Sequence, residues 1–421
     1  EEEVTRRTIM RYYKRKNPML VREMIRNVYK ECKGVPKSSC LTKEQRLSLQ
    51  MDKFMNRRYE FRYNTQIGEV EYRERFSFQF YFHPIDKRAQ NSIMLDAQSE
   101  GIGVWDRDID RYLHSNRVPI YNPLEEFLFH LPHWDGKDRI HALANRVPCK
   151  NPHWELLFHR WFLNMVSHWR GVDKMHANNT SPILVGRQGT HKSTFCREMI
   201  PPALRAYYTD SIDFSQKRDA ELYLNRFALI NIDEFDQITL PQQGFLKHIL
   251  QKPVVNLRKP HGRSVLELQR YASFIGTSNQ KDLLTDPSGS RRFICIEVTG
   301  NIDTTQPIDY EQLYAQAMHE IYHGERYWFD SEDEQIMTEN NREFEQTPAM
   351  LQLFYQYFKA AQTKEEGEFL TPVEILNYLK KKSGMSLSDN KVYHFGRLLQ
   401  KCGIPSKHTY KGTVYQVIKL S

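Results

Sequence analysis

The chain has 421 residues, of which 40% are hydrophobic and 27% are charged, and its formal net charge is +8. This length exceeds what one ordinary core accommodates, so we expect two to four domains. The sequence contains no signal-peptide pattern and no apolar run near the roughly 18 residues that span a bilayer, which argues against a membrane protein. Six scattered cysteines without a C-x-x-C pair suit a reducing cytoplasm better than a disulfide framework or a zinc module.

The positive charge is concentrated at the two ends of the chain. Residues 1–75 hold 19 Lys and Arg against 11 Asp and Glu, residues 370–421 hold 9 against 2, and the middle is acidic. Basic ends suggest contacts with a polyanion, although solvated surface and a disordered arm are the alternative for the first stretch. Because Glu1 stands where Met is usual, we also expect that an upstream domain is missing.

The first expected region, residues 1–120, is a basic α/β region suited to nucleic-acid contact or oligomerisation. Helical spacing of apolar residues predicts a helix over Ile9–Cys32. Alternation in the aromatic run Phe76–Phe82 predicts a strand, with an apolar helix edge as the alternative. The segment Arg57–Tyr63 interleaves arginines with aromatic residues, which fits either a base-stacking surface or an ordinary amphipathic one.

The middle of the chain predicts a helical region followed by an α/β core. Residues 121–180 are expected to form a collar-like helical region with a turn at 134–140. In residues 181–335, short apolar strands alternate with helices, which favours a parallel sheet covered on both faces. The expected strands are Ile183–Val185, Phe227–Ile232, Ala272–Gly276 and Arg292–Val298. A helical segment and a charged linker are expected over 336–368.

Residues 369–421 predict a winged helix that binds DNA. Thr371 and Pro372 are a good N-cap and first residue for a helix that extends to Lys382. A second helix over Ser388–Lys401 is the expected recognition helix, with Lys391 and Arg397 as DNA contacts. A hairpin that turns at 411–412 follows it.

The segment from Ile183 to Thr194 carries the main chemical signal. An apolar strand leads into a Gly-containing loop, and Lys192-Ser193 stands at the expected start of a helix. In such loops the backbone N–H groups wrap phosphates, the lysine reaches the β- and γ-phosphates, and the hydroxyl ligates Mg²⁺. The predicted nucleotide-binding residues are Gly186, Arg187, Gln188, Gly189, Thr190, His191, Lys192, Ser193 and Thr194.

Two later strands end in side chains that complete a hydrolytic site. Asp233 would hold Mg²⁺ together with Ser193, and Glu234 would orient and polarise the attacking water. Asn279 would lie between the metal and the γ-phosphate. Taken alone, a strand that simply ends in acidic loop residues is the simpler interpretation of Asp233-Glu234; its distance from the phosphate loop favours the site.

Two basic features follow the acidic pair. Arg291 and Arg292 suggest an arginine finger, which a neighbouring subunit often supplies, and a plain surface pair is the alternative. Apolar residues at 254–255 and 265–266 predict a hairpin with a basic tip that suits a loop gripping phosphates, or else an exposed turn. The tip residues are Arg258, Lys259, His261 and Arg263.

This series of segments resembles the virulence-associated protein E family, which comprises AAA+-type ATPases related to superfamily 3 helicases of phages, plasmids and mobile elements. The segments that match are 122–128, 134–139, 186–194, 231–234, 276–279 and 286–293. The resemblance implies an ASCE-type AAA+ core, ATP as the nucleotide, a hexameric-type ring, a DNA-tracking tip at 258–263 and a neighbouring primase domain. The C-terminal winged helix is a weaker match.

One residue departs from the family pattern. His191 occupies the place before the lysine, where the family usually has glycine. We expect non-glycine dihedrals there because the residue lies near a helix start. Since every other catalytic residue is intact, we predict an active Mg²⁺-dependent ATPase that works as a DNA helicase or translocase in replication. The alternatives are an initiator or regulator that binds nucleotide without translocating, and an ATPase of phage interference.

Overall fold

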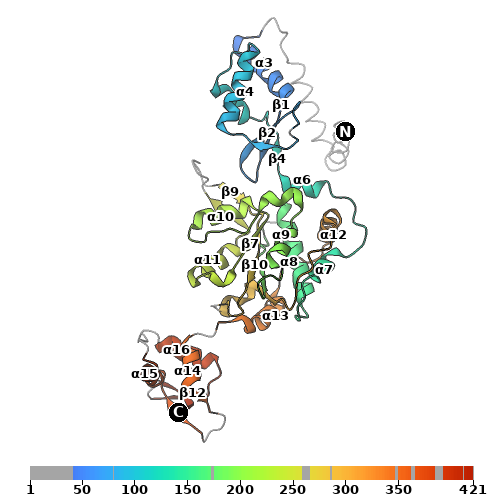
Figure 1. Cartoon of the computed structure of the whole chain (residues 1–421). Helices are drawn as coiled ribbons and strands as arrows, with labels where there is room; N and C mark the ends of the chain where they lie inside the picture. The colour runs from blue at the N-terminus through green and yellow to red at the C-terminus, as the bar shows by residue number, and fades with distance from the viewer. Residues whose placement is uncertain are drawn as a thin grey trace. The chain divides into compact units, whose positions relative to one another are not determined.

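The computed structural model describes residues 41–78, 80–171, 175–257, 266–284, 287–346, 349–361, 366–384, 392–410 and 412–420. The predicted helix at Ile9–Cys32, the hairpin tip and Lys391 lie outside these residues. The chain forms two compact units, Glu1–Pro123 and Leu124–Ser421, and each is described by itself (Figure 1). Both combine helices with sheets, in agreement with the predicted α/β class.

Within residues 41–123, the first unit packs three helices on a small sheet of strand order β3-β2-β1-β4. Thr42 begins the first helix with a capping box, in which its side chain and that of Gln45 bond each other's backbone. The hydrophobic core includes Phe54, Tyr59 and Ile93. The elements are α3 (Lys43–Arg58), β1 (Tyr59–Asn64), β2 (Glu69–Glu74), β3 (His83–Pro84), α4 (Lys87–Ser99), α5 (Asp106–Leu113) and β4 (Ile120–Tyr121).

The strand predicted over Phe76–Phe82 is wrong. The antiparallel ladder between β1 and β2 ends at the pair Tyr59–Glu74, and residues 75–78 turn away from it. Phe76 and Phe78 are 88% and 97% exposed, so no second layer covers the face that the alternation would have buried. Period-two alternation marks a strand only where one face is packed.

The side chains of residues 57–63 pack within the first unit or form ion pairs with other residues of that unit. The Tyr59 and Phe61 side chains are buried in the core of this unit. Arg57 bonds Glu100, and Arg62 donates to Glu71 at 2.6 Å. These contacts favour the amphipathic interpretation over a base-stacking surface.

The second unit begins with three helices that lead into its main sheet. They are α6 (Pro123–Phe129), α7 (Arg139–Ala144) and α8 (Trp154–Trp169). The last of these is buried along nearly its whole length, including Trp161 and Phe162 at 0% exposed. A helix that is apolar all round belongs inside a core.

Five parallel strands form the main sheet, in the order β11-β5-β10-β7-β6. The three inner strands β5, β10 and β7 and the edge strand β11 match the four predicted strands, and nearly all of their residues are buried, as expected for a sheet covered by helices. The strands are β5 (Ser181–Val185), β6 (Tyr208–Thr209), β7 (Leu229–Ile232), β10 (Ser273–Ser278) and β11 (Phe293–Glu297). The two-residue edge strand β6 was not predicted.

Helices connect these strands, and further helices follow the last strand of the sheet as far as Phe344. The α-helices are α9 (Lys192–Glu198), α10 (Lys217–Arg226), α11 (Leu240–Leu250), α12 (Tyr310–Tyr322) and α13 (Ser331–Asn341). The 3₁₀ helices are η2 (Pro202–Tyr207), η3 (Phe235–Gln237), η4 (Pro287–Arg292) and η5 (Arg342–Phe344). The predicted hairpin is present as the antiparallel pair β8 (Val254–Leu257) and β9 (Leu266–Gln269).

The C-terminal part has its own hydrophobic cluster, which includes Phe354, Leu376, Phe395 and Val417. Thr371 caps its second helix as predicted, and the predicted hairpin pairs Thr409 with Gly412. The elements are α14 (Ala349–Tyr357), β12 (Phe358–Ala360), β13 (Glu368–Leu370), α15 (Pro372–Ser383), α16 (Val392–Lys401), β14 (Ser406–Thr409) and β15 (Gly412–Lys419). Strand β15 pairs with the other three strands. The hydrophobic cluster also includes residues of α14, so this part of the chain begins before the predicted boundary at residue 369.

Candidate nucleotide site

The loop from Gly186 to His191 joins β5 to α9 at the carboxyl edge of the parallel sheet, where open α/β sheets bind their ligands. Gly186 packs tightly against the end of β11, because a Cβ there would lie 3.0 Å from the Val298 carbonyl oxygen and the Val298 backbone would have to shift to admit it. Gly189 has a φ of 84°, a left-handed conformation that glycine adopts without steric cost. The two glycines thus fix the close packing and the turn of the loop.

Lys192 is buried at the first position of α9, with 6% of its surface exposed. Its ammonium group donates to the carbonyl oxygens of Gly186 and Arg187, both at 2.8 Å, and to Asn279 Oδ1 at 3.2 Å. Burial lowers the pKa of Lys192, while the charges of Asp233 and Asp236 act in the opposite direction. The ammonium is therefore held between the loop and the end of β10.

The backbone of His191 corrects the expectation for this position. The residue has φ 64° and ψ 22°, which is the left-handed conformation. The expected dihedrals were ones that non-glycine residues adopt without cost, and the left-handed conformation is not among them. Histidine is among the non-glycine residues enriched in this region, so the loop keeps a glycine-like backbone at a modest cost. The side chain is exposed and lines the cavity described below.

Asp233 and Glu234 follow β7 and face the phosphate loop. The Ser193 hydroxyl donates to Asp233 Oδ1 at 3.0 Å, and Thr277 bonds the same oxygen. Glu234 has a φ of 53°. Among the described residues, His191 and Glu234 are the two non-glycine residues with positive φ, and backbone strain of this kind clusters at functional sites.

A cavity of about 300 Å³ brings most of the predicted site residues together. Strand β10 lies between β5 and β7, so Asn279 emerges between the phosphate loop and the acidic pair. Thr277 also lines the cavity and was not predicted, although its place two residues before Asn279 is a signal for it. The cavity is lined by Gln188, Gly189, Thr190, His191, Lys192, Ser193, Thr194, Asp233, Glu234, Thr277 and Asn279.

The predicted arginines do not line this cavity. Arg291 and Arg292 end η4, and Arg291 donates to Glu334 of α13 at 2.9 Å. The Arg291 side chain remains 48% exposed, so this contact is a weak surface ion pair. Arg397 lies apart from the cavity on α16, where it is exposed and bonds the Tyr393 hydroxyl at 2.7 Å.

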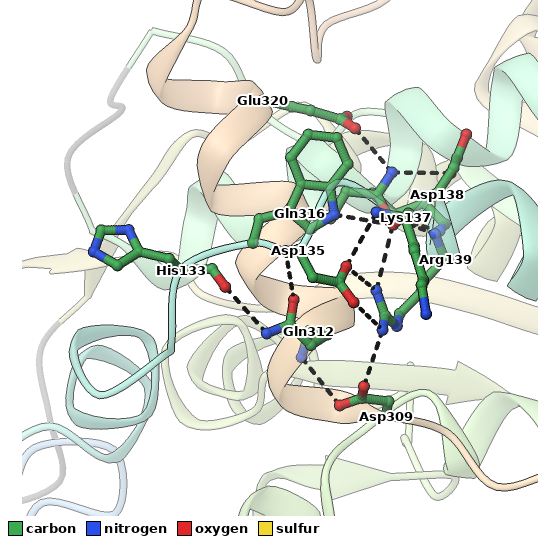
Figure 2. Close-up of polar contacts among 11 residues, drawn as sticks. His133, Asp135, Lys137, Asp138, Arg139, Asp309, Gln312, Gln316 and Glu320 are labelled. Carbon is green, nitrogen blue, oxygen red and sulfur yellow. Dashed lines mark hydrogen bonds and ion pairs between the residues drawn. The ribbon is translucent and has the colours of Figure 1, made fainter.

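Hydrogen bonds and ion pairs of Asp135, Asp138 and Arg139 with Asp309 and Gln316, together called the bracket here, link two segments that lie far apart in the sequence (Figure 2). The bracket joins the turn at 134–139 to α12. Arg139 bonds both Asp135 and Asp309, and the Gln316 side chain accepts the backbone N–H of Arg139 at 2.6 Å and donates to Asp138 at 2.9 Å. Hydrogen bonding from Arg139 holds the pKa of Asp135 well below its usual range.

Two sets of hydrogen bonds connect the bracket to the loop 186–191 and to helix α9, one from α12 and one from the segment before α12. Tyr310 and Tyr314 of α12 donate to the carbonyl oxygens of Glu198 and Met199 at the end of α9. The backbone N–H of Ile302 donates to the Thr190 carbonyl at 3.1 Å. The turn at 134–139 thus contacts α12, which in turn bonds the end of α9, and the turn does not line the cavity.

The family of the chain follows from its sequence match. The virulence-associated protein E-like domain matches residues 128–346, which is more than half of the chain and contains the whole cavity. The chain therefore belongs to the virulence-associated protein E-like family. A second family, a domain of unknown function from B. theta (DUF3874), matches residues 347–417.

Solved structures add a distant similarity. Three apo structures of the NrS-1 C-terminal region share 11–12% identity with the chain, at TM-scores of 0.42–0.45. They cover 88% of this chain, and 98–99% of each of those chains is covered. No curated protein matches. Within the described residues, no helix has the length and apolar character required to cross a membrane.

Proposed function

We propose that the chain is a Mg²⁺-dependent ATPase that assembles into a ring and moves along DNA, as a helicase or translocase in the replication of a phage or mobile element. The observation that carries the proposal is the cavity that gathers Lys192, Ser193, Asp233, Glu234 and Asn279 from three adjacent strand ends. Family membership agrees with this assignment.

The residues around the cavity suit a magnesium-bound triphosphate. Ser193 and Asp233 offer neighbouring oxygen atoms, the ligand type that Mg²⁺ prefers. In the described part of the chain, no three His, Cys, Asp or Glu side chains gather as a metal cage. We expect an ion held by one carboxylate, a hydroxyl and phosphate oxygens, where it would neutralise charge on the phosphates.

Each remaining residue has a role within reach of its position. Lys192 would bind the β- and γ-phosphates, for which it would exchange its present carbonyl partners. Glu234 would accept hydrogen bonds from the attacking water and polarise it. Asn279, already in contact with Lys192, would sense the γ-phosphate.

Assembly and DNA binding rest on fewer contacts. Arg291 lies outside the cavity of its own chain and is half-exposed, which suits a finger that reaches the site of a neighbouring subunit. Arg397 and Tyr393 are exposed together on α16, the expected recognition helix, and would contact DNA phosphates and bases. A primase domain or partner remains an expectation from the resemblance.

The decisive experiment measures phosphate release from ATP with and without single-stranded DNA. Glu234→Gln should retain ATP binding and lose turnover, while Lys192→Ala should lose both. Glu297→Gln, an exposed acid at the end of the neighbouring strand β11, is the matched control and should hydrolyse ATP normally. Unchanged turnover in Glu234→Gln would contradict the assignment.

The same assay separates the alternatives. A nucleotide-binding initiator or regulator would bind ATP and DNA without DNA-stimulated phosphate release. Strand displacement on a forked DNA then distinguishes a helicase from an ATPase of phage interference that does not unwind. Arg397→Ala should weaken DNA binding and lower its salt dependence by about one phosphate contact.

A further inference from the structure

Three consecutive residues after β7 face three different surroundings. Glu234 lines the cavity, while Phe235 is 0% exposed and packs edge-on against Phe293, with ring centres 5.2 Å apart. Asp236 faces the end of β10. The turn is closed by the Gln237 N–H, which donates to the Glu234 carbonyl at 2.8 Å. The buried ring therefore fixes the turn, and the two acids project on either side of it.

Asp236 Oδ1 joins this turn to the neighbouring strand. It accepts the Ser278 hydroxyl at 2.8 Å and the backbone N–H of Asn279 at 3.3 Å, while its second oxygen accepts the Gln237 amide at 2.9 Å. Burial raises the pKa of Asp236, but these hydrogen bonds outweigh burial and bring the pKa below its ordinary value. The carboxylate is thus held ionised by bonds from two segments.

Asn279 is the residue that these bonds restrain. Its backbone is tied to Asp236 and its side chain accepts from Lys192 at 3.2 Å. Asp236 itself does not line the cavity. A continuous path of contacts therefore runs from the Glu234 turn through Asp236 and Asn279 to the phosphate-binding lysine.

We propose that Asp236 is a positioning residue whose Oδ1 atom locks Asn279 to the turn that carries Glu234. The residue that polarises water and the residue that senses the γ-phosphate would then keep one fixed spacing. A displacement of about 1 Å in such a pair is enough to slow a reaction about 100-fold. The proposal rests on the ATPase function proposed above and assigns to the site a residue that does not touch the substrate.

The test compares two substitutions at this position. Asp236→Ala removes the acceptor, and we expect kcat to fall about 10- to 100-fold while the affinity for a fluorescent ATP analogue changes little. Asp236→Asn keeps an oxygen that can accept both bonds, so kcat should stay within about threefold of wild type. Gln237→Ala is the matched control, because Gln237 contacts the other oxygen of the same carboxylate, and it should behave as wild type.

Two results would overturn the proposal. Normal turnover in Asp236→Ala would show that the hydrogen bonds from Ser278 and Asn279 to Asp236 have no role in ATP hydrolysis. An Asp236→Asn variant as slow as Asp236→Ala would show that the negative charge, and not the acceptor oxygen, is required. Where Asp236→Ala does not fold, Ser278→Ala removes one of the two donors and should give a smaller loss of kcat in the same direction.

Amide hydrogen exchange separates this proposal from the ATPase assignment. The Asn279 N–H should be protected in the wild type and in Asp236→Asn, and should exchange faster in Asp236→Ala, whether or not the chain hydrolyses ATP. A wild-type chain without hydrolysis would refute the ATPase function. Unchanged exchange in Asp236→Ala would refute the lock.

Discussion

At the scale of single residues, the backbone at His191 and Glu234 distinguishes this site from the rest of the described chain. Both residues have positive φ, at 64° and 53°, and both line the cavity. A left-handed conformation costs roughly 1–2 kcal/mol for a non-glycine residue. Such strain persists only where the surrounding structure imposes it, which here means the phosphate loop and the turn after β7.

The strain at His191 predicts how substitutions rank. His191→Val places a β-branched side chain in the left-handed region and should lower the free energy of unfolding by about 1–2 kcal/mol, measured with urea. His191→Asn should be nearly neutral, because asparagine tolerates this conformation. Arg197→Val, an exposed change in the right-handed helix α9, is the control and should cost less than about 0.7 kcal/mol. Equal losses for the two valine variants would show that φ at 191 is not strained.

At the scale of elements, the helix cap at Thr371 is a feature that the sequence predicted and the structure shows. Thr371 accepts the Glu374 N–H at 3.2 Å, and the Glu374 carboxylate accepts the Thr371 N–H at 2.7 Å. Thr371→Ala should therefore destabilise α15 by about 1 kcal/mol. Hydrogen exchange of the α15 amides is the measurement. Val373→Ala, on an exposed position of the same helix, should leave the cap intact, and equal exchange in both variants would argue against it.

The bracket between the 134–139 turn and α12 predicts a dependence of stability on acid. Burial raises the pKa of Asp138, but hydrogen bonds from Gln316 and His141 lower it by more than burial raises it. The pKa of Asp138 therefore lies below the ordinary 3.8. A carboxyl with a depressed pKa stabilises the fold above its unfolded pKa and loses that contribution as the pH falls through the folded pKa.

The matching measurement is urea unfolding at several pH values. Asp138→Asn should be less stable than wild type at pH 7, and the difference should shrink below pH 3.8. Glu339→Gln, an exposed acid on α13, is the control and should show a smaller difference with less dependence on pH. A difference between wild type and Asp138→Asn that is constant with pH would contradict the role of the bonds to Asp138.

The elements also show where sequence reasoning succeeds and fails. Strands β5, β7, β10 and β11 of the main sheet were predictable because burial on both faces makes them continuous, largely apolar runs. Strands β1 and β2 were missed although their residues alternate between apolar and polar, because the interleaved arginines and aromatic residues of β1 also fit a base-stacking or amphipathic surface. At the aromatic run 76–82 the opposite occurred: a strand was predicted where the described residues form none. Local pattern does not reveal whether a second layer will cover a face.

The candidate site was predictable to a similar extent. The loop, the acidic pair and Asn279 follow from residue types at strand ends, since parallel strands bring their carboxyl ends to one edge. The hydrogen bonds from Thr277 to Asp233 and from Ser278 to Asp236 depend on strand order, which short segments do not encode. The left-handed φ of His191 likewise requires the folded loop.

At the scale of the whole molecule, the proposed ring predicts that two inactive variants restore each other. A Lys192→Ala chain would lose its own nucleotide site and still offer Arg291, whereas an Arg291→Ala chain would keep its site and lack the proposed finger. Mixing them should recover part of the ATPase rate, because mixed rings contain interfaces with one intact site and one intact finger. Arg292→Ala in place of Arg291→Ala identifies which arginine acts.

The readout for this mixture is phosphate release at a constant total protein concentration. Recovery above the sum of the separate rates supports a finger supplied between subunits. No recovery for either arginine variant would place the finger within its own chain or remove it from the mechanism. Glu334→Gln, which frees Arg291 from its present ion pair, should leave the rate unchanged or raise it, since exposed pairs contribute at most about 1 kcal/mol.

The conformation of His191 also affects how chains of this kind are found in genomes. A search pattern that demands glycine before the lysine of the phosphate loop passes over this chain, although its loop keeps the backbone that glycine would give. The physical requirement is a dihedral angle near 60°, which asparagine and histidine also tolerate. Open reading frames with these residues at that place, otherwise discarded as degenerate, therefore remain candidates for nucleotide-driven motors.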